Sequence, residues 1–155
     1  GVAFNLGLLL AEEGKTAEAE TALRTALKAD PQMAQAAYNL AVLVAPKNLA
    51  EALELSRKAA ALRPEEPRYA FTLAFYQRQR GDAPAAMTTL QTLLARHPAY
   101  GDAYLLLGEL YVKAGKVQEA RQLFARALEV KELPDAHRTR IASLQRNLAG
   151  SDAKQ

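Results

Sequence analysis

Two histidines, His97 and His137, are the only side chains that could supply an imidazole, and the chain contains no cysteine. Catalysis or metal binding at an imidazole needs a partner group nearby, such as a nucleophile, a carboxylate or a second ligand. His97 directly precedes Pro98, and neither histidine has such a partner at triad or ligand spacing. We interpret both as structural residues, one near a helix end and one on an amphipathic face.

Other catalytic patterns are also absent from the sequence. It contains no Gly-rich phosphate loop, no H-E-x-x-H motif and no G-x-S-x-G motif. The acidic pairs Glu12-Glu13 and Glu65-Glu66 fall at turns, where carboxylates are most simply solvated. We therefore expect a protein that is not an enzyme and that uses no cofactor or metal.

The composition predicts helices throughout. Of the 155 residues, 33 are Ala and 25 are Leu, and both types lose little conformational freedom in a helix. A charge, Gly or Pro interrupts every apolar run before the roughly 18 residues that span a bilayer, so no membrane insertion is expected. The net charge is +3 with the two signs interspersed, which neither shows nor excludes a nucleic-acid footprint.

A repeat of about 34 residues runs through the chain. Leucines recur at intervals of 34, 33 and 34 residues, alanines at 33, 34 and 34, and prolines at 33 and 34. The short interval falls at different places in the leucine and alanine series, which locates a one-residue deletion near Pro46. The recurring residues are Leu6, Leu40, Leu73 and Leu107, then Ala19, Ala52, Ala86 and Ala120, then Pro31, Pro64 and Pro98.

Each repeat has the pattern of two helices joined by a tight turn. Gly14, Gly81 and Gly115 stand where the first helix must end, because Gly adopts a left-handed conformation without steric cost. Side-chain oxygens that can cap the following helix come next, and prolines end the second helices. The predicted caps are Thr16, Asn48 and Asp82, and the predicted helices span residues 2–13, 16–29, 34–45, 49–62, 67–80, 83–96, 101–114, 117–130 and 134–149.

The repeats resemble the tetratricopeptide repeat family. The fourth repeat matches the pattern W-x2-L-G-x2-Y…A-x3-F with Tyr in place of Trp, and the first and third repeats match much of the same signature. Ser56 and Leu93 depart from it, because the family has a large apolar residue at the first position and a small one at the second. The matching residues of the fourth repeat are Tyr104, Leu107, Gly108, Tyr111, Ala120, Phe124 and Ala127.

The resemblance implies an all-α fold, a right-handed α-solenoid of four helix-turn-helix repeats. Small residues at helix crossings, such as Gly108 and Ala120, are expected to allow close packing. A helix at 134–149 is expected to cap the solenoid, and residues 150–155 to form a disordered tail. Further repeats or another domain are expected to precede Gly1. The repeats are expected at about 1–33, 34–66, 67–100 and 101–133, within a single domain of residues 1–149.

In proteins of this family the first helix of each repeat lines the inner side of the superhelix, where peptides usually bind. The resemblance therefore implies a peptide-binding groove on these helices. Phe71 and Phe75, four residues apart and flanked by Arg68 and Arg78, form its predicted apolar centre. Alternatively, the two phenylalanines fill the seam between repeats. The predicted groove residues are Phe4, Asn5, Leu8, Tyr38, Asn39, Val42, Arg68, Phe71, Thr72, Phe75, Arg78, Leu105 and Glu109.

The expected partner is a protein or peptide segment with apolar anchors and some acidic residues. The family's carboxylate clamp, which holds chaperone tails, has Lys and Asn where this chain has Phe4 and Leu8. Only Asn39 and Arg68 fit the clamp, so recognition of a free C-terminal carboxylate by that mode is not expected.

Other roles stay open. The first repeat or the groove could mediate self-association into a homo-oligomer. Arg138, Arg140 and Arg146 suggest nucleic-acid binding, but they lack the interleaved aromatic residues of such surfaces. Residues 69–80 and 99–102 also look similar to repeat modules fused behind bacterial multihaem cytochromes, although no haem attachment motif is present. The sequence indicates neither compartment nor organism.

Overall fold

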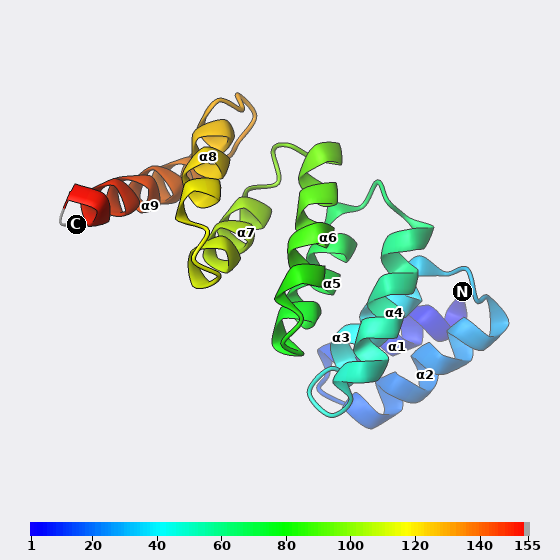
Figure 1. The fold of residues 1–155 in the computed structure, drawn as a ribbon. Coiled ribbons are helices and arrows are strands. Elements are labelled where there is room, and N and C mark those ends of the chain that lie inside the picture. Colours follow the sequence, from blue (N-terminus) through cyan, green and yellow to red (C-terminus); the bar gives the residue numbers. More distant parts are fainter. Residues whose placement is uncertain (154–155) are drawn as a thin grey trace. The chain divides into compact units, whose positions relative to one another are not determined.

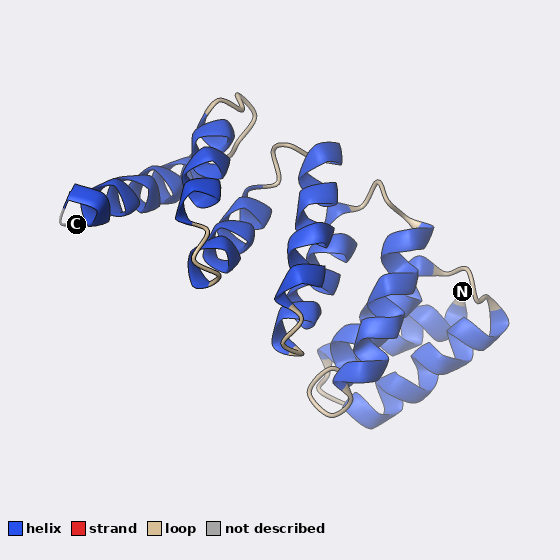
Figure 2. Cartoon of the chain, in the orientation of Figure 1, coloured by secondary structure: helices blue, strands red, loops and turns tan. Residues whose placement is uncertain are grey.

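Helices account for nearly all of the chain. The computed structural model describes residues 1–153, and in this range it contains nine α-helices and no strand (Figures 1 and 2). Side chains are described through residue 150. The helices are α1 (Val2–Glu12), α2 (Thr16–Ala29), α3 (Ala34–Val44), α4 (Leu49–Leu62), α5 (Pro67–Gln79), α6 (Ala83–Arg96), α7 (Gly101–Lys113), α8 (Val117–Leu128) and α9 (Asp135–Ala153).

The helix ends lie close to their predicted positions, with α9 as the exception. The predicted disordered tail at 150–155 is wrong for residues 150–153, because α9 continues to Ala153, and residues 154–155 lie outside the described part of the chain. Gly150 lowers helix stability by about 1 kcal/mol relative to Ala, but no Pro follows it to remove a backbone donor. A single unfavourable residue therefore does not end this helix.

Glycines in the left-handed conformation close three of the four hairpins. Gly14, Gly81 and Gly115 have φ of 77°, 89° and 77°, as predicted. After Gly14, Lys15 donates its backbone N–H to the Leu10 carbonyl and occupies the N-cap position of α2. The predicted cap at Thr16 is therefore wrong, because Thr16 is already the first helical residue.

The other two predicted caps are confirmed. The Asn48 side chain accepts a hydrogen bond from the Glu51 backbone N–H at 3.1 Å. The Asp82 carboxylate accepts one from the Ala85 backbone N–H at the same distance. Each bond satisfies a donor that the first helical turn leaves without a partner.

The first compact unit, Gly1–Gly81, contains α1 to α5. In it α1 packs against α2, α2 against α3, α3 against α4, and α4 against α5. Leu23, Leu40 and Val44 are almost completely buried in its core. A Cβ atom on Gly7 would lie 2.8 Å from the Leu23 Cγ, so the absence of a side chain there lets α1 and α2 approach closely.

The second compact unit, Asp82–Gln155, contains α6 to α9. Here α7 contacts α6, α8 and α9, and α9 also packs against α8. Ile141 of α9 is completely buried. The predicted packing residues Gly108 and Ala120 are both buried, and Gly108 faces the ring of Phe124.

The boundary between the two units falls between Gly81 and Asp82, inside the third predicted repeat at 67–100. The repeats of the sequence and the compact units of the structure therefore have different boundaries. A single domain that comprises residues 1–149 stays a prediction.

Candidate peptide-binding surface

The candidate surface of the first unit lies on α1, α3 and α5, the first helices of the first three repeats. These helices carry every predicted groove residue except Leu105 and Glu109. Those two lie on α7 of the second unit, where Leu105 is half-buried and Glu109 is exposed. The structure therefore brings most of the predicted set onto neighbouring helices of one compact unit.

An aromatic pair joins α3 to α5. The rings of Tyr38 and Tyr69 stack with their centroids 4.7 Å apart and their planes at 28°. The guanidinium of Arg68 lies over the Tyr38 ring, 5.1 Å from its centroid. Offset stacking and a cation above a ring are both favourable contacts. They hold the charge of Arg68 in a defined place on this surface.

The three residues of this aromatic group differ in how far they are exposed to solvent. Tyr69 is 2% exposed, and its burial raises the pKa of the phenol. Tyr38 is half-buried, and Arg68 is exposed. No carboxylate among the described residues forms an ion pair with Arg68, so its charge is available to an acidic group of a partner.

Phe75 contacts the hydrophobic core and is also partly exposed at the surface. It is half-buried and packs against the core cluster that contains Leu73 and Tyr76. The guanidinium of Arg78 lies 4.9 Å from the centroid of the Phe75 ring. Phe71, one helical turn earlier, is also half-buried. Packing of Phe75 against the core is what the seam-filling alternative expects, and the predicted anchor role of the pair stays a prediction.

The remaining predicted residues differ in their availability. Val42 is 45% exposed, and Asn5 is also exposed. Phe4 packs against the same core cluster as Phe75. The Asn39 side-chain N–H donates to the Gln35 carbonyl at 2.8 Å, so that donor is engaged within α3. Leu8 and Thr72 are half-buried.

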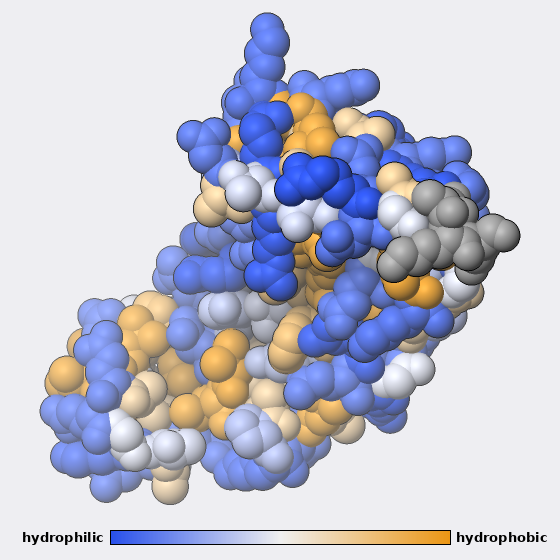
Figure 3. Space-filling model, turned by 90° about the vertical axis from the view of Figure 1, so that its left-hand side faces the viewer, coloured by the Kyte–Doolittle hydropathy of each residue, from blue (hydrophilic) through white to orange (hydrophobic). Residues whose placement is uncertain are grey.

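Apolar side chains also reach the molecular surface. Figure 3 shows orange, apolar patches open among blue, hydrophilic side chains on the face that it draws. On α1 the exposed apolar residues are Val2, Leu6 and Leu9, which lie on one face at i, i+4 and i+7. Exposed apolar side chains that share a helix face indicate a contact surface more strongly than scattered ones do.

A cluster of charged side chains, which the sequence analysis missed, links α2 to α4. Arg24 donates to Glu20 at 2.8 Å and to Glu51 at 2.7 Å, and Lys47 also donates to Glu20. Hydrogen bonds from Lys47 and Arg24 lower the pKa of Glu20, and a hydrogen bond from Arg24 lowers the pKa of Glu51. The i, i+4 spacing of Glu20 and Arg24 signals one pair, whereas the bond to Glu51 requires knowledge of how α2 and α4 pack.

His137 has a partner that lies 35 residues away in the sequence. Its Nε2 atom is 2.9 Å from the Asp102 Oδ1 atom, which connects α9 to α7. The imidazole also covers Gly101, where a Cβ atom would lie 2.2 Å from the His137 Cγ. These contacts give His137 a structural role in packing α9. His97 is the C-cap residue of α6.

Neither a metal centre nor a membrane segment is found in the described part of the chain. Within that part, no three His, Asp or Glu side chains are grouped so that they could hold a metal ion. No helix there combines the length and the apolar character that crossing a bilayer requires.

Comparison with protein families identifies repeats over most of the chain. One family model described as tetratricopeptide repeat matches residues 4–67, and another with the same description matches residues 77–148. No curated protein matches the sequence significantly.

Solved structures share the fold at low sequence identity. The crystal structure of MamA matches with a TM-score of 0.74 and 23% identity, over 84% of this chain and 72% of that chain. A tetratricopeptide repeat protein from Parabacteroides merdae ATCC 43184 matches with a TM-score of 0.80 and 22% identity, over 96% of this chain and 59% of that chain. YrrB, described as a TPR protein with an unusual peptide-binding site, matches with a TM-score of 0.70 and 22% identity, over 82% and 66%. These likenesses confirm an all-α helical-repeat fold of the solenoid class.

Proposed function

The chain belongs to the tetratricopeptide repeat family, and we propose that it is a non-catalytic scaffold for protein interaction. In this proposal a segment of a partner protein binds on α1, α3 and α5 of the first unit. The observation that carries it is the position of Arg68, whose unpaired guanidinium lies over the Tyr38 ring that stacks on Tyr69. A cation held on an aromatic surface can pair with a carboxylate while the surrounding rings contact apolar groups.

The residues around Arg68 indicate the chemistry of the partner. Phe71 and Phe75 are half-buried, so each could still bury more apolar area against a bound segment. Exposed Val42 of α3 adds a further apolar contact. The favoured partner segment therefore carries apolar anchors and at least one acidic residue. Two or three anchors at about 1.5–3 kcal/mol each, less the cost of ordering the peptide, correspond to micromolar affinity at best.

The test begins with identification of the partner. Affinity capture with the full-length protein, followed by peptide mapping, gives a bound segment whose affinity is then measured by calorimetry with the synthetic peptide. We expect Arg68→Glu to weaken binding at least about tenfold, because it replaces attraction by repulsion. The double variant Phe71→Ala with Phe75→Ala should abolish binding.

Controls separate loss of contact from loss of structure. Lys28→Glu reverses an exposed charge on α2, outside the candidate surface, and should leave the affinity unchanged. Circular dichroism of each variant must show the helical content of the parent, since Phe75 also contacts the core. Unchanged affinity of a folded Arg68→Glu variant would place the binding site elsewhere.

Self-association is a second candidate function, which the exposed face of α1 favours. Leu6 is 47% exposed, whereas its counterparts Leu40 and Leu107 in later repeats are each 1% exposed. A second copy of the chain could cover Leu6 together with Val2 and Leu9. Light scattering across a concentration series distinguishes the candidates, because Leu6→Glu should lower the average mass only if copies associate through this face.

A further inference from the structure

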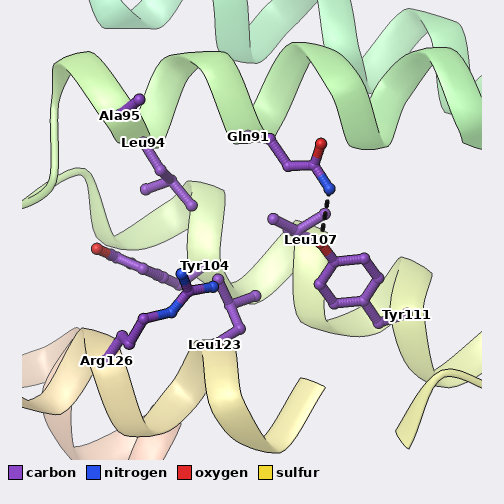
Figure 4. A pocket seen from close by; sticks show the side chains of 8 residues that line it. All are labelled: Gln91, Leu94, Ala95, Tyr104, Leu107, Tyr111, Leu123 and Arg126. Atoms are coloured by element: carbon purple, nitrogen blue, oxygen red, sulfur yellow. Dashed lines mark hydrogen bonds between the residues drawn. The ribbon is translucent and has the colours of Figure 1, made fainter. Parts of the chain in front are cut away.

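A pocket of about 240 Å³ lies in the second unit, between α6, α7 and α8 (Figure 4). Figure 4 shows side chains of all three helices directed into it, with α6 along one side and α8 along the other. None of its lining residues belongs to the candidate surface described above. The pocket is lined by Gln91, Leu94, Ala95, Tyr104, Leu107, Tyr111, Leu123 and Arg126.

Two tyrosines of α7 are fixed at this pocket by hydrogen bonds. The Tyr104 hydroxyl donates to the Pro98 carbonyl at 2.6 Å. The Tyr111 hydroxyl accepts a hydrogen bond from the Gln91 side-chain N–H at 2.7 Å, which joins α7 to α6. Both rings are buried, so the walls that they form are ordered before any ligand binds.

The equivalent positions in the first unit carry smaller side chains. In the register of the repeats, Tyr104 and Tyr111 correspond to Ala37 and Val44 of α3, which are completely buried in clusters of apolar side chains. The two tyrosine rings that line the pocket in the second unit therefore have no counterpart at these positions of α3.

A difference in charge accompanies this difference in size. The ion-pair cluster between α2 and α4 depends on Glu20 and Arg24, whose counterparts on α6 are Met87 and Gln91. The corresponding cluster therefore cannot form between α6 and α8. Gln91 bonds to Tyr111 instead.

The volume and lining of the pocket limit what it can bind. Sites for drug-sized molecules and cofactors usually measure about 300–1,000 Å³, whereas a cavity of about 150 Å³ already holds benzene. A pocket of about 240 Å³ lined by Leu94, Leu107 and Leu123 therefore fits a single large apolar side chain. Such a side chain is the usual anchor of a peptide interface.

Arg126 determines the charge that a ligand should carry. This residue is exposed at the pocket, and in the described part of the chain no carboxylate forms an ion pair with it. A carboxylate beside an inserted apolar group could therefore pair with the guanidinium without displacing an existing partner.

We propose that this pocket binds one large apolar side chain, Phe or Leu, of an acidic peptide segment whose carboxylate pairs with Arg126. The proposal rests on the interaction role proposed above but assigns a second site, in a different compact unit. Its test therefore uses short probes that report on α6, α7 and α8 alone.

The probes are the blocked tripeptides acetyl-Asp-Phe-Asp-amide, acetyl-Asp-Ala-Asp-amide and acetyl-Lys-Phe-Lys-amide. Titration of the full chain is followed by methyl NMR signals of Leu94, Leu107 and Leu123. We expect saturable shifts of these methyl groups with the Asp-Phe-Asp probe and none with the Asp-Ala-Asp probe. The Lys-Phe-Lys probe should bind at least about threefold more weakly than the Asp-Phe-Asp probe, because Arg126 repels it.

Matched variants locate the binding. Ala95→Leu fills the pocket from α6 and should abolish saturation, while Ala125→Leu adds the same group at an exposed position of α8 outside the lining. Arg126→Glu should weaken the Asp-Phe-Asp probe at least about threefold, whereas Arg140→Glu, an exposed charge reversal on α9, should not. Each variant is compared with the parent by thermal denaturation before it is titrated.

Three results would overturn the proposal. They are the absence of saturable shifts with the Asp-Phe-Asp probe, shifts confined to residues outside the pocket, and unchanged binding in a folded Ala95→Leu variant. Loss of partner binding in the α5 variants described above does not affect these results. Failure of the pocket and failure of the proposed surface on α1, α3 and α5 are therefore distinguishable.

Discussion

The ring of Phe124 lies against the backbone of Gly108, so closely that a Cβ atom on this glycine would be 2.3 Å from the ring Cζ atom. Phe124 is 2% exposed, so its ring is buried at this contact. The close approach of α7 and α8 therefore depends on the missing side chain.

We expect Gly108→Leu to lower the free energy of unfolding by at least about 1–3 kcal/mol, because it overpacks this contact. Urea denaturation monitored by circular dichroism measures the change. Gly150→Ala is the control and should not lower stability, since no atom lies within 4 Å of a Cβ at that position and Ala favours a helix more than Gly does. If Gly108→Leu and the parent have equal free energies of unfolding, α7 and α8 can move apart without loss of stability.

A second close contact predicts coupling between two substitutions. Gly101→Ala would place a Cβ atom 2.2 Å from the His137 Cγ and should destabilise the chain. His137→Ala removes the two nearest atoms, Cγ and Cδ2, and leaves only the His137 Cβ atom, at 2.7 Å. It should therefore relieve part of the clash, so that the double variant is more stable than the sum of the two single effects predicts. A double-mutant cycle from urea denaturation curves measures this coupling, and additive effects would refute direct contact.

The charged cluster on α2 and α4 predicts a dependence of stability on pH. Bonds from Lys47 and Arg24 lower the pKa of Glu20, and a bond from Arg24 lowers that of Glu51, below the ordinary value of 4.5. The stabilisation is therefore complete above the ordinary pKa and is lost as the pH falls through the lower pKa values of the folded state. The partial exposure of these side chains keeps the effect modest.

Urea denaturation between pH 7 and pH 3 measures this dependence. Glu51→Gln should reduce the loss of stability on acidification, because the variant has one fewer carboxylate to protonate. Glu18→Gln, an exposed substitution on α2, serves as the control. If Glu51→Gln and the parent lose stability equally, the ion pair with Arg24 makes no contribution in solution.

Ser56 predicts a stabilising substitution. It is completely buried on α4, and its Oγ atom has no hydrogen-bond partner among the described residues. Ser56→Ala removes a polar atom that lost its hydration on folding, and should raise the free energy of unfolding by about 1 kcal/mol. Thermal denaturation tests the expectation.

A matched substitution isolates this effect. The exposed Thr21 hydroxyl donates to the Ala17 carbonyl at 3.2 Å, so Thr21→Ala removes a solvated group and should change stability little. A decrease in stability for Ser56→Ala would mean that its hydroxyl is bonded in solution.

Local signals explain why the helices could be predicted from sequence. Gly115 ends α7 because its left-handed conformation is available without strain, and Asn48 begins α4 because its side chain reaches a backbone donor three residues ahead. Both effects act within a few residues. The prediction for Thr16 failed at the same scale, because Lys15 took the cap position.

The contacts that define the candidate surface and the pocket could not be predicted in the same way. Arg68 lies over Tyr38, thirty positions earlier in the chain, and Gln91 bonds to Tyr111 across two helices. Such contacts depend on the distances between helices, and the spacing of residues within one helix does not give these distances. The family resemblance predicted Arg68 as a groove residue. It did not predict that the Arg68 guanidinium lies over the Tyr38 ring.

The segment from Leu40 to Ala52, which joins α3 to α4, is one residue shorter than the corresponding segments of the other repeats, because of the deletion near Pro46. Counted back from Ala52, Lys47 stands where the other repeats have a left-handed glycine, and its backbone needs no such conformation. This position can therefore carry a residue with a long side chain. Lys47 forms an ion pair with Glu20 of the preceding repeat. The side chain at this bend therefore contributes an ion pair between adjacent hairpins, which high salt should weaken.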